Sequence, residues 1–246
     1  MKNFIIVCAG LKGGSGKSCV CANLAMHLID QGIPVIVYDA DIQQTLVRHR
    51  QRELAEHPDA QPPYQLMPFS TADAESVKSN LAQLKAVPAV VLIDCPGNIQ
   101  DACLQHIYEA ADIAVVPTHY DFDNIDATVL FSEMFTKISK AKMFFVPNCI
   151  NAIEERREEI QKARDIAKKM LEKYGAVTAR IKQCVTVKCY STIFPHDYYK
   201  RNAVNHAFES IINEVNAKLF LLEPSIIGGR VITDTPSNDS LLTFPS

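Results

Sequence analysis

The chain has 246 residues, of which 48% are hydrophobic and 22% charged, and its formal net charge is −3 with a pI of about 6.2. A chain of this length can bury a sizeable core, as one large domain or two small ones. The small negative charge excludes a uniformly basic nucleic-acid-coating protein. Any binding of DNA or other anions therefore has to come from a local patch.

The cysteines and the apolar runs indicate where the chain resides. Eight cysteines are present, and no two have the C-x-x-C spacing of a zinc site or a redox pair. We expect buried free thiols, which suit a reducing cytosol. No apolar run reaches the roughly 20 residues of a membrane span, and the first run is too short for a signal peptide. The sequence predicts a cytoplasmic protein.

Short apolar runs alternate with helical patterns along the chain. Gly32 and Gly175 are expected to close the helices that precede them. The expected strands cover residues 4–9, 34–41, 64–69, 89–97, 112–118, 142–148 and 176–181. The expected helices cover residues 17–31, 44–56, 72–85, 99–110, 124–139, 154–174 and 202–221.

The alternation predicts the fold class. Strand runs without polar alternation are typical of a parallel sheet that is covered on both faces. We therefore expect an α/β fold with a doubly wound, mostly parallel sheet and helices on both faces. One domain is expected over residues 1–222, and the Gly-, Pro- and Ser-rich residues 223–246 are expected to form a weakly structured tail.

A phosphate-binding loop follows the first expected strand. The stretch GLKGGSGKS matches G-x-x-x-x-G-K-[ST], beginning at Gly10 and lying between a strand and a helix. Lys17 is expected to reach the β- and γ-phosphates and Ser18 to ligate Mg²⁺. This motif makes the expected fold one of the P-loop NTPase type, and the alternative is a glycine turn with an incidental lysine. Backbone N–H groups are expected to face the phosphates from Gly13, Gly14, Ser15 and Gly16.

Acids follow two further expected strands. Asp94 ends the run VVLID and is expected to hold the metal, while the alternative is a strand-end acid satisfied by turn amides. Asp39 and Asp41 are two residues apart, so both side chains can aim at one centre. We expect Asp39 to support the metal and Asp41 to position or deprotonate the attacking water. The alternative for this pair is a polar strand terminus.

The motifs together resemble the ParA/MinD group of ATPases. KGGSGKS resembles the deviant phosphate loop KGGxGK[ST] of that group, DADIQQ its DxDxQ element, and LIDCPG its Walker B and switch II sequence. VVPTHYDFDNIDAT and VPNCIN resemble later segments in the same order. The resemblance covers residues 1 to about 150 and is loose over 176–221.

The resemblance implies roles for particular residues. Lys12 would cross an ATP-dependent homodimer to contact the partner's phosphates, which places Lys12 with Lys17 and Asp41 among the catalytic residues. Asn148 would lie near the adenine, and the cofactors would be ATP and Mg²⁺. Relatives carry Thr where this chain has Cys19, a weaker donor, so that phosphate contact is in doubt. Without a helix-turn-helix extension ahead of the first strand, we expect no sequence-specific operator binding.

The resemblance also implies a positioning switch. ATP would give a dimer that binds a surface, and hydrolysis, stimulated by a ParB-like or other activating protein, would release it. Residues 180–201 hold five basic side chains against Asp197, so nonspecific DNA is the expected surface, for partition or positioning of a plasmid or mobile element. Such a protein would be nucleoid-associated. No basic amphipathic helix ends the chain, which disfavours binding to a membrane.

Two alternative functions stay open. They are a positioning ATPase acting on a protein cargo and a P-loop metabolic enzyme similar to amidoligases or dethiobiotin synthetase.

Overall fold

A computed structural model of the chain describes residues 4–84, 86–154 and 157–221. Its centre is a sheet of seven strands in the order β3-β2-β4-β1-β5-β6-β7, and every neighbouring pair is parallel. The prediction of a weakly structured tail at 223–246 falls outside the described residues. The strands are β1 (Phe4–Cys8), β2 (Val35–Asp39), β3 (Gln65–Pro68), β4 (Val90–Asp94), β5 (Ile113–Thr118), β6 (Lys142–Pro147) and β7 (Gly175–Val177).

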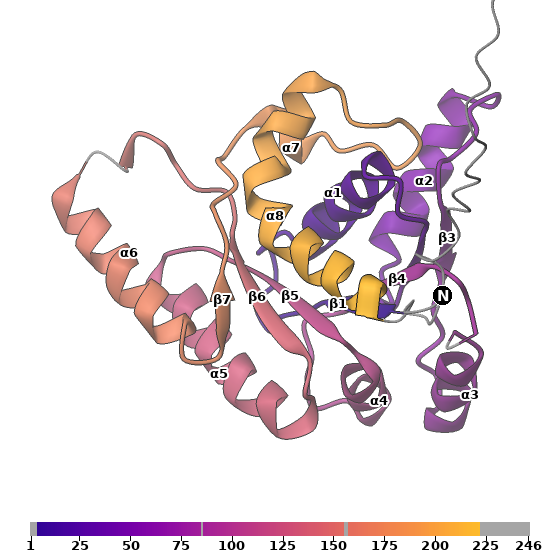
Figure 1. Cartoon of the computed structure of the whole chain (residues 1–246), viewed down its shortest axis with the longest axis horizontal. Coiled ribbons are helices and arrows are strands. Elements are labelled where there is room, and N and C mark those ends of the chain that lie inside the picture. Colours follow the sequence, from indigo (N-terminus) through magenta and orange to yellow (C-terminus); the bar gives the residue numbers. More distant parts are fainter. Residues whose placement is uncertain (1–3, 85, 155–156, 222–246) are drawn as a thin grey trace, which may run out of the picture.

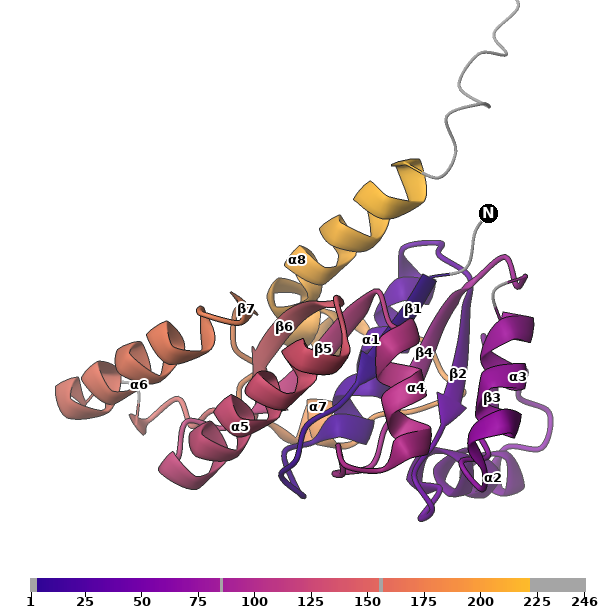
Figure 2. The ribbon, with the colours of Figure 1, turned by 90° about the horizontal axis from the view of Figure 1, so that it is seen from below.

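Helices cover both faces of the sheet, which confirms the predicted doubly wound α/β fold (Figure 1 and Figure 2). Successive side chains of β1 enter opposite clusters, Ile6 on one face and Ile5 on the other, so the strand is apolar throughout. One face carries α1 (Lys17–Asp30), α2 (Thr45–Glu56), α7 (Val185–Lys188) and α8 (Tyr198–Leu221). The other carries α3 (Ala74–Leu84), α4 (Ala102–Ala110), α5 (Phe122–Ile138) and α6 (Glu158–Leu171).

The two predicted glycine caps have different outcomes. Gly32 closes α1 as expected: it has a φ of +75°, and its N–H donates to the Ile29 carbonyl at 2.9 Å. The prediction for Gly175 is wrong, because α6 ends four residues earlier and Gly175 begins β7. There it allows a close strand approach, since a Cβ would lie 2.3 Å from the Met143 carbonyl oxygen.

The C-terminal region differs most from the expected elements. The short helix α7 was not predicted, and α8 begins at Tyr198 instead of residue 202. The earlier start has a local cause, because the Asp197 carboxylate accepts a hydrogen bond from the Lys200 N–H at 2.7 Å, as a helix N-cap does. The strand expected over 176–181 is shortened to β7, and a single bridge pairs Lys182 with Ile150.

The register of the central strands places the predicted site. Cys8 at the end of β1 pairs with Asp94 of β4, and Asp94 also pairs with Asp39 of β2. The phosphate loop and both acids therefore leave the sheet at one level, beyond the carboxyl ends of the strands, where open α/β sheets bind ligands. Within the described residues, no helix combines the length and apolar character that a bilayer span requires.

Candidate nucleotide-binding site

The loop between β1 and α1 has a backbone that only glycine tolerates easily. Gly14 and Gly16 have φ values of +80° and +91°, and Gly16 is the N-cap of α1. A Cβ on Gly16 would lie 2.3 Å from Nδ2 of Asn148, and this amide donates to the Ser15 carbonyl at 3.0 Å. Asn148, predicted to lie near the adenine, therefore supports the loop from the end of β6.

Lys17 is the first residue of α1, and its ammonium group lies under the loop. Its Nζ donates to the Lys12 carbonyl at 3.2 Å, so the loop curls around it. Burial lowers the pKa of Lys17, while the nearby carboxylates of Asp94 and Asp41 oppose that shift. The amides at the start of α1 and this cation together favour a bound anion.

Asp94 is almost fully buried at the end of β4, and neither carboxylate oxygen accepts a hydrogen bond from a described residue. Burial raises the pKa of Asp94 to about 7, and the nearby Ser18 hydroxyl and Lys17 ammonium oppose this shift. The Ser18 hydroxyl is close to the carboxylate but does not have the geometry of a hydrogen bond to it. A buried carboxylate without partners is costly unless a cation is bound. Hydroxyl and carboxylate oxygens are the ligands that Mg²⁺ takes, so Ser18 and Asp94 fit the predicted metal.

Asp39 and Asp41 lie beside this carboxylate with different surroundings. The Asp39 carboxylate accepts hydrogen bonds from the N–H groups of Leu46, Val47 and Asp41, at 2.9 to 3.2 Å. It therefore fixes the first turn of α2, while burial raises its pKa. The Asp41 side chain is partly exposed and accepts a hydrogen bond from the Gln43 N–H at 2.9 Å. The metal role of Asp39 and the water-positioning role of Asp41 stay predictions.

Lys12 lies at the outer rim of the loop, 45% exposed. Its Nζ is 4.0 Å from the Asp123 carboxylate at the start of α5, and Asp123 is itself largely exposed. An exposed pair at this distance holds a lysine only weakly. Large apolar side chains are also exposed in segments that follow strands β2, β5, β6 and β7: Ile42, Phe122, Ile153 and Val185.

A cavity of about 500 Å³ adjoins the phosphate loop. One wall is Gly14, Gly16, Cys19 and Asn148, and these residues were predicted to bind the nucleotide. The Cys19 thiol donates to the Val187 carbonyl at 3.3 Å, and burial raises its pKa to about 12. The opposite wall was missed, since it comes from the region where the family resemblance is loose: Lys182, Gln183, Cys184, Val185, Val187 and Lys188.

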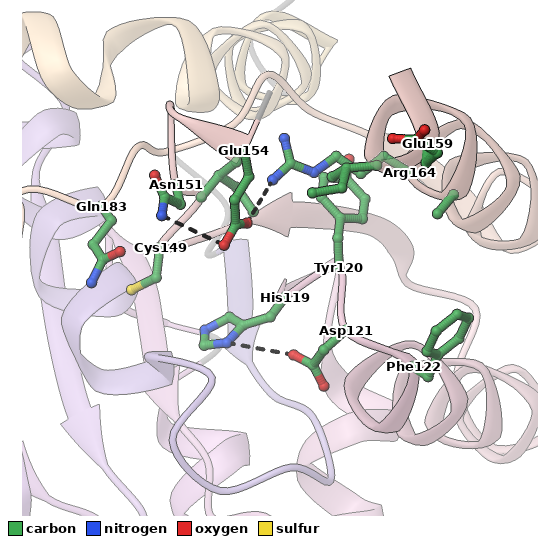
Figure 3. A pocket seen from close by; sticks show the side chains of 13 residues that line it. His119, Tyr120, Asp121, Phe122, Cys149, Asn151, Glu154, Glu159, Arg164 and Gln183 are labelled. Carbon is green, nitrogen blue, oxygen red and sulfur yellow. Dashed lines mark hydrogen bonds and ion pairs between the residues drawn. The ribbon is translucent and has the colours of Figure 1, made fainter. Parts of the chain in front are cut away.

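A second cavity, of about 570 Å³, lies next to the first and shares Cys149 and Gln183 with it (Figure 3). His119 and Glu154 approach it from opposite sides, and the Glu154 carboxylate is 3.5 Å from the Arg164 guanidinium. The His119 imidazole is 3.9 Å from the Asp121 carboxylate. The lining therefore offers both charges to a polar ligand.

The structure divides the basic segment that was expected to bind DNA. Lys182 and Lys188 line the cavity beside the phosphate loop, and Arg201 lies 3.4 Å from the Asp30 carboxylate. Tyr190 is partly buried and packs on His49 with ring centroids 4.6 Å apart. Lys182 and Lys188 are exposed at that wall, and Arg180 is exposed just before them. At the start of α8, the largely exposed Tyr198 and Tyr199 precede the partly buried Lys200.

Several solved structures share this fold. A putative plasmid partition protein from Borrelia burgdorferi B31, bound to AMPPNP, is similar with a TM-score of 0.68 and 16% identity, over 87% of this chain and 100% of that chain. The septum site-determining protein MinD of Pyrococcus horikoshii OT3, complexed with Mg-ADP, has a TM-score of 0.65 and 17% identity, over 88% and 98%. Apo McdA from Cyanothece has a TM-score of 0.68 and 16% identity, over 87% and 99%.

No curated protein matches the chain. The model of the CobQ/CobB/MinD/ParA nucleotide-binding domain family matches residues 6–222, which is most of the sequence and includes every predicted site residue. The match extends through α7 and α8, where the motifs alone gave only a loose resemblance. The chain therefore belongs to the CobQ/CobB/MinD/ParA family of nucleotide-binding domains.

Proposed function

We propose that the chain is a ParA-like ATPase that binds Mg-ATP, dimerises around it, binds DNA without sequence preference and is released by hydrolysis. Such a cycle would partition or position a plasmid or mobile element, with a ParB-like or other protein stimulating turnover. The single observation that carries the nucleotide part is Asp94, buried with both oxygens unpartnered among the described residues, beside the Lys17 ammonium and the Ser18 hydroxyl. In the metal-free chain this carboxyl has no hydrogen-bond donor within the described residues, and a bound cation would supply the missing partner.

The geometry of the loop supports a role for each predicted site residue. Bound Mg²⁺ would neutralise phosphate charge, and Ser18 with Asp94 would hold it. Lys17 and the amides of the loop would bind and orient the phosphates, and Asp41 would position or deprotonate the attacking water. Gly13, Gly14, Ser15 and Gly16 supply those amides, and Asn148 keeps the loop in place through the Ser15 carbonyl.

The dimer is supported by the surface around the loop. Lys12 has a weak, exposed ion pair with Asp123 in its own chain, so it is available to a partner's phosphates. Ile42 and Phe122 are 85% and 84% exposed in segments at the same strand ends. A second copy would bury these apolar side chains and deliver its Lys12 as a cation in trans.

The test of the dimer compares two lysines with a matched control. Light scattering coupled to size exclusion would measure the mass of the wild type with ATP, with ADP and without nucleotide. We expect Lys17→Ala to lose nucleotide binding, and Lys12→Ala to keep most of it but lose the ATP-dependent dimer and turnover. Lys140→Ala, an exposed lysine after α5, should change neither. A Lys12→Ala protein that dimerises and hydrolyses normally would refute the role in trans.

DNA binding is supported by the start of α8 and is tested separately. A filter assay with a nonhydrolysable ATP analogue should retain DNA, and ADP should not. A variant with Tyr198, Tyr199 and Lys200 changed to Ala should lose retention while keeping ATP binding, because aromatic stacking and phosphate contact are lost. Equal retention with ADP would contradict the switch. An ATP-dependent protein partner with no DNA in the complex would point to a protein cargo instead.

The second cavity favours one further candidate function. An ATP-dependent enzyme similar to amidoligases or dethiobiotin synthetase binds a small carboxylate beside its nucleotide. The cavity of about 570 Å³ adjoins the loop-side cavity, and a small acid would take the place of Glu154 at the Arg164 guanidinium and of Asp121 at the His119 imidazole. ATP turnover measured against a panel of small mono- and dicarboxylates decides between the two. Stimulation by one acid, and not by DNA, would select the enzyme.

A further inference from the structure

A second group of buried ligand atoms lies at the far end of α1. His27 and Asp30 are one turn apart near the end of this helix, and His196 precedes α8, which packs against α1. One ligand-capable atom of each residue lies within 4.8 Å of the other two. The group is separate from the phosphate loop, which lies at the opposite end of α1 (Figure 1).

The two imidazoles are buried without full satisfaction. His27 is 2% exposed and His196 is 6% exposed, and Nδ1 of each has no hydrogen-bond partner among the described residues. The Asp30 side chain is 8% exposed, and its carboxylate lies 3.5 Å from Nδ1 of His196. Buried polar atoms without partners are rare in native proteins, so each calls for an explanation such as an ion.

The neighbouring asparagine fixes the proton on His196. The Asn23 amide nitrogen donates to the Cys19 carbonyl at 2.8 Å, so its oxygen is the atom that faces Nε2 of His196 at 3.2 Å. Nε2 must therefore carry the hydrogen, and Nδ1 of the neutral ring is a bare lone pair. A lone pair facing a carboxylate at 3.5 Å is repulsive unless a proton or a cation lies between them.

The surroundings select a cation over a proton. A proton between Nδ1 of His196 and the Asp30 carboxylate would leave Nδ1 of His27 without a partner in the described part of the chain, whereas one cation can be reached by a ligand atom of all three residues. The carbonyl end of α1 adds the negative end of the helix dipole at Asp30. The half-exposed Arg201 guanidinium lies 3.4 Å from the Asp30 carboxylate and donates to the His196 carbonyl at 3.2 Å, so a bound ion would have to displace it from Asp30.

We propose that His27, Asp30 and His196 form a binding site for a divalent transition-metal ion of the Zn²⁺ type, which ties the start of α8 to the end of α1. Two imidazole nitrogens and one carboxylate are a ligand set for Zn²⁺ and Co²⁺, whereas Mg²⁺ and Ca²⁺ take oxygen ligands. Asn23 is the partner that orients the His196 ligand, as such sites require. The ion would be structural, and this site is independent of the proposed ATPase function.

The test is a Co²⁺ titration of the full chain after chelator treatment. We expect one Co²⁺ per chain with visible bands of nitrogen and oxygen ligation, displaced by Zn²⁺ and unaffected by millimolar Mg²⁺. The eight free cysteines are the obvious competitors, and their binding would give thiolate charge-transfer bands in the near ultraviolet. A titration showing only those bands, or no visible band, would overturn the proposal.

Variants make the assignment specific. His27→Gln and His196→Gln should each weaken Co²⁺ binding by more than about 100-fold, beyond the 10- to 100-fold typical of losing a group that only hydrogen-bonds a ligand. His206→Gln, an exposed histidine on α8, is the matched control and should bind normally. Zn²⁺ should raise the Tm of the wild type and of the control, and not that of the two variants. Equal binding by all proteins, or an imidazole NMR titration that finds His196 protonated at neutral pH, would reject the site.

Discussion

The two ends of helix α1 hold buried polar groups that differ in which atoms the described chain leaves without a hydrogen-bond partner. At the first end, loop amides, Lys17 and Ser18 surround the Asp94 carboxylate, which has no hydrogen-bond partner among the described residues. At the last end, Asp30 lies between two imidazoles whose Nδ1 atoms have no hydrogen-bond partner in the described chain. The helix dipole favours anions at its start and cations at its end. One buried helix can therefore offer two sites, one for an anion at its first end and one for a cation at its last end.

The largest expected effect is on the pH dependence of the first end. Because burial raises the pKa of Asp94 to about 7, the native chain keeps a proton that the unfolded chain has lost between roughly pH 4 and pH 7. In the metal-free protein this group alone should therefore contribute roughly 4 kcal/mol of stability that is lost as pH rises through this window. The lowered pKa values of the buried His27 and His196 contribute in the opposite direction, so the effect of Asp94 is read from the difference between variants. Asp94→Asn should remove this effect in urea unfolding with EDTA present.

The exposed acid Asp126 on α5 provides the control for this experiment. Asp126→Asn should keep the slope of the wild type, because that carboxylate has no burial to relieve. Asp94→Asn should also lose the Mg²⁺ dependence of nucleotide binding, whereas Asp126→Asn should keep it. An Asp94→Asn protein whose stability has the same pH dependence as the wild type would contradict the account of Asp94.

The second effect concerns the loop itself. Gly16→Ala places a Cβ at a φ of +91° and 2.3 Å from the Asn148 amide. We expect a loss of about 2–3 kcal/mol in the free energy of unfolding, from backbone strain and displacement of that amide. Gly13→Ala in the same loop should cost little, because its Cβ would meet no atom within 4 Å. Chemical denaturation without nucleotide measures both, and equal losses would show that the loop relaxes freely.

How far the sequence could predict these features depends on how they are built. The phosphate loop is contiguous and follows a strand, so its place in the fold was predicted from residues 10–18 alone. Asp94 and Asp39 were placed correctly at one sheet edge, because parallel strands align their carboxyl ends. These are features for which local pattern and topology agree.

The features that were missed join residues distant in the chain. His27 and His196 are brought together only when α8 packs on α1, and no spacing rule connects them. The far wall of the nucleotide cavity, from Lys182 to Lys188, follows an irregular segment with one short helix. Lys182 and Lys188 were predicted only as part of a basic segment, because their charge does not show that these exposed side chains also line a cavity.

A third, smaller effect tests the residue between the two ends. Asn23→Ala removes the amide that donates to the Cys19 carbonyl and accepts from His196. We expect a loss of about 2 kcal/mol in the free energy of unfolding, since buried groups lose their partners. The ¹⁵N shifts of His196 should then report a mixture of tautomers, whereas nucleotide affinity should change little. Asn202→Ala on the exposed side of α8 is the control. An unchanged tautomer would show that Asn23 does not fix the ring.

The smallest effect returns to the position where this chain departs from its relatives. The Cys19 thiol donates to the Val187 carbonyl, and with a pKa raised to about 12 it is a thiol and a weak donor at neutral pH. Cys19→Thr supplies a stronger donor at the start of α1, and a hydroxyl that turns to the phosphates should tighten ATP binding by less than about 1 kcal/mol.

Calorimetric titration with ATP distinguishes the two possible hydrogen-bond partners of the threonine hydroxyl in the Cys19→Thr protein. A Thr that keeps the Val187 carbonyl as its partner would leave affinity unchanged and raise Tm slightly. A Thr that contacts phosphate would raise affinity without that gain. Cys19→Ala removes both options and should bind ATP about as the wild type does, because the thiol faces α7 in this structure. A marked loss of ATP affinity in Cys19→Ala would instead show that the thiol itself contacts the nucleotide, as the sequence predicts for Cys19.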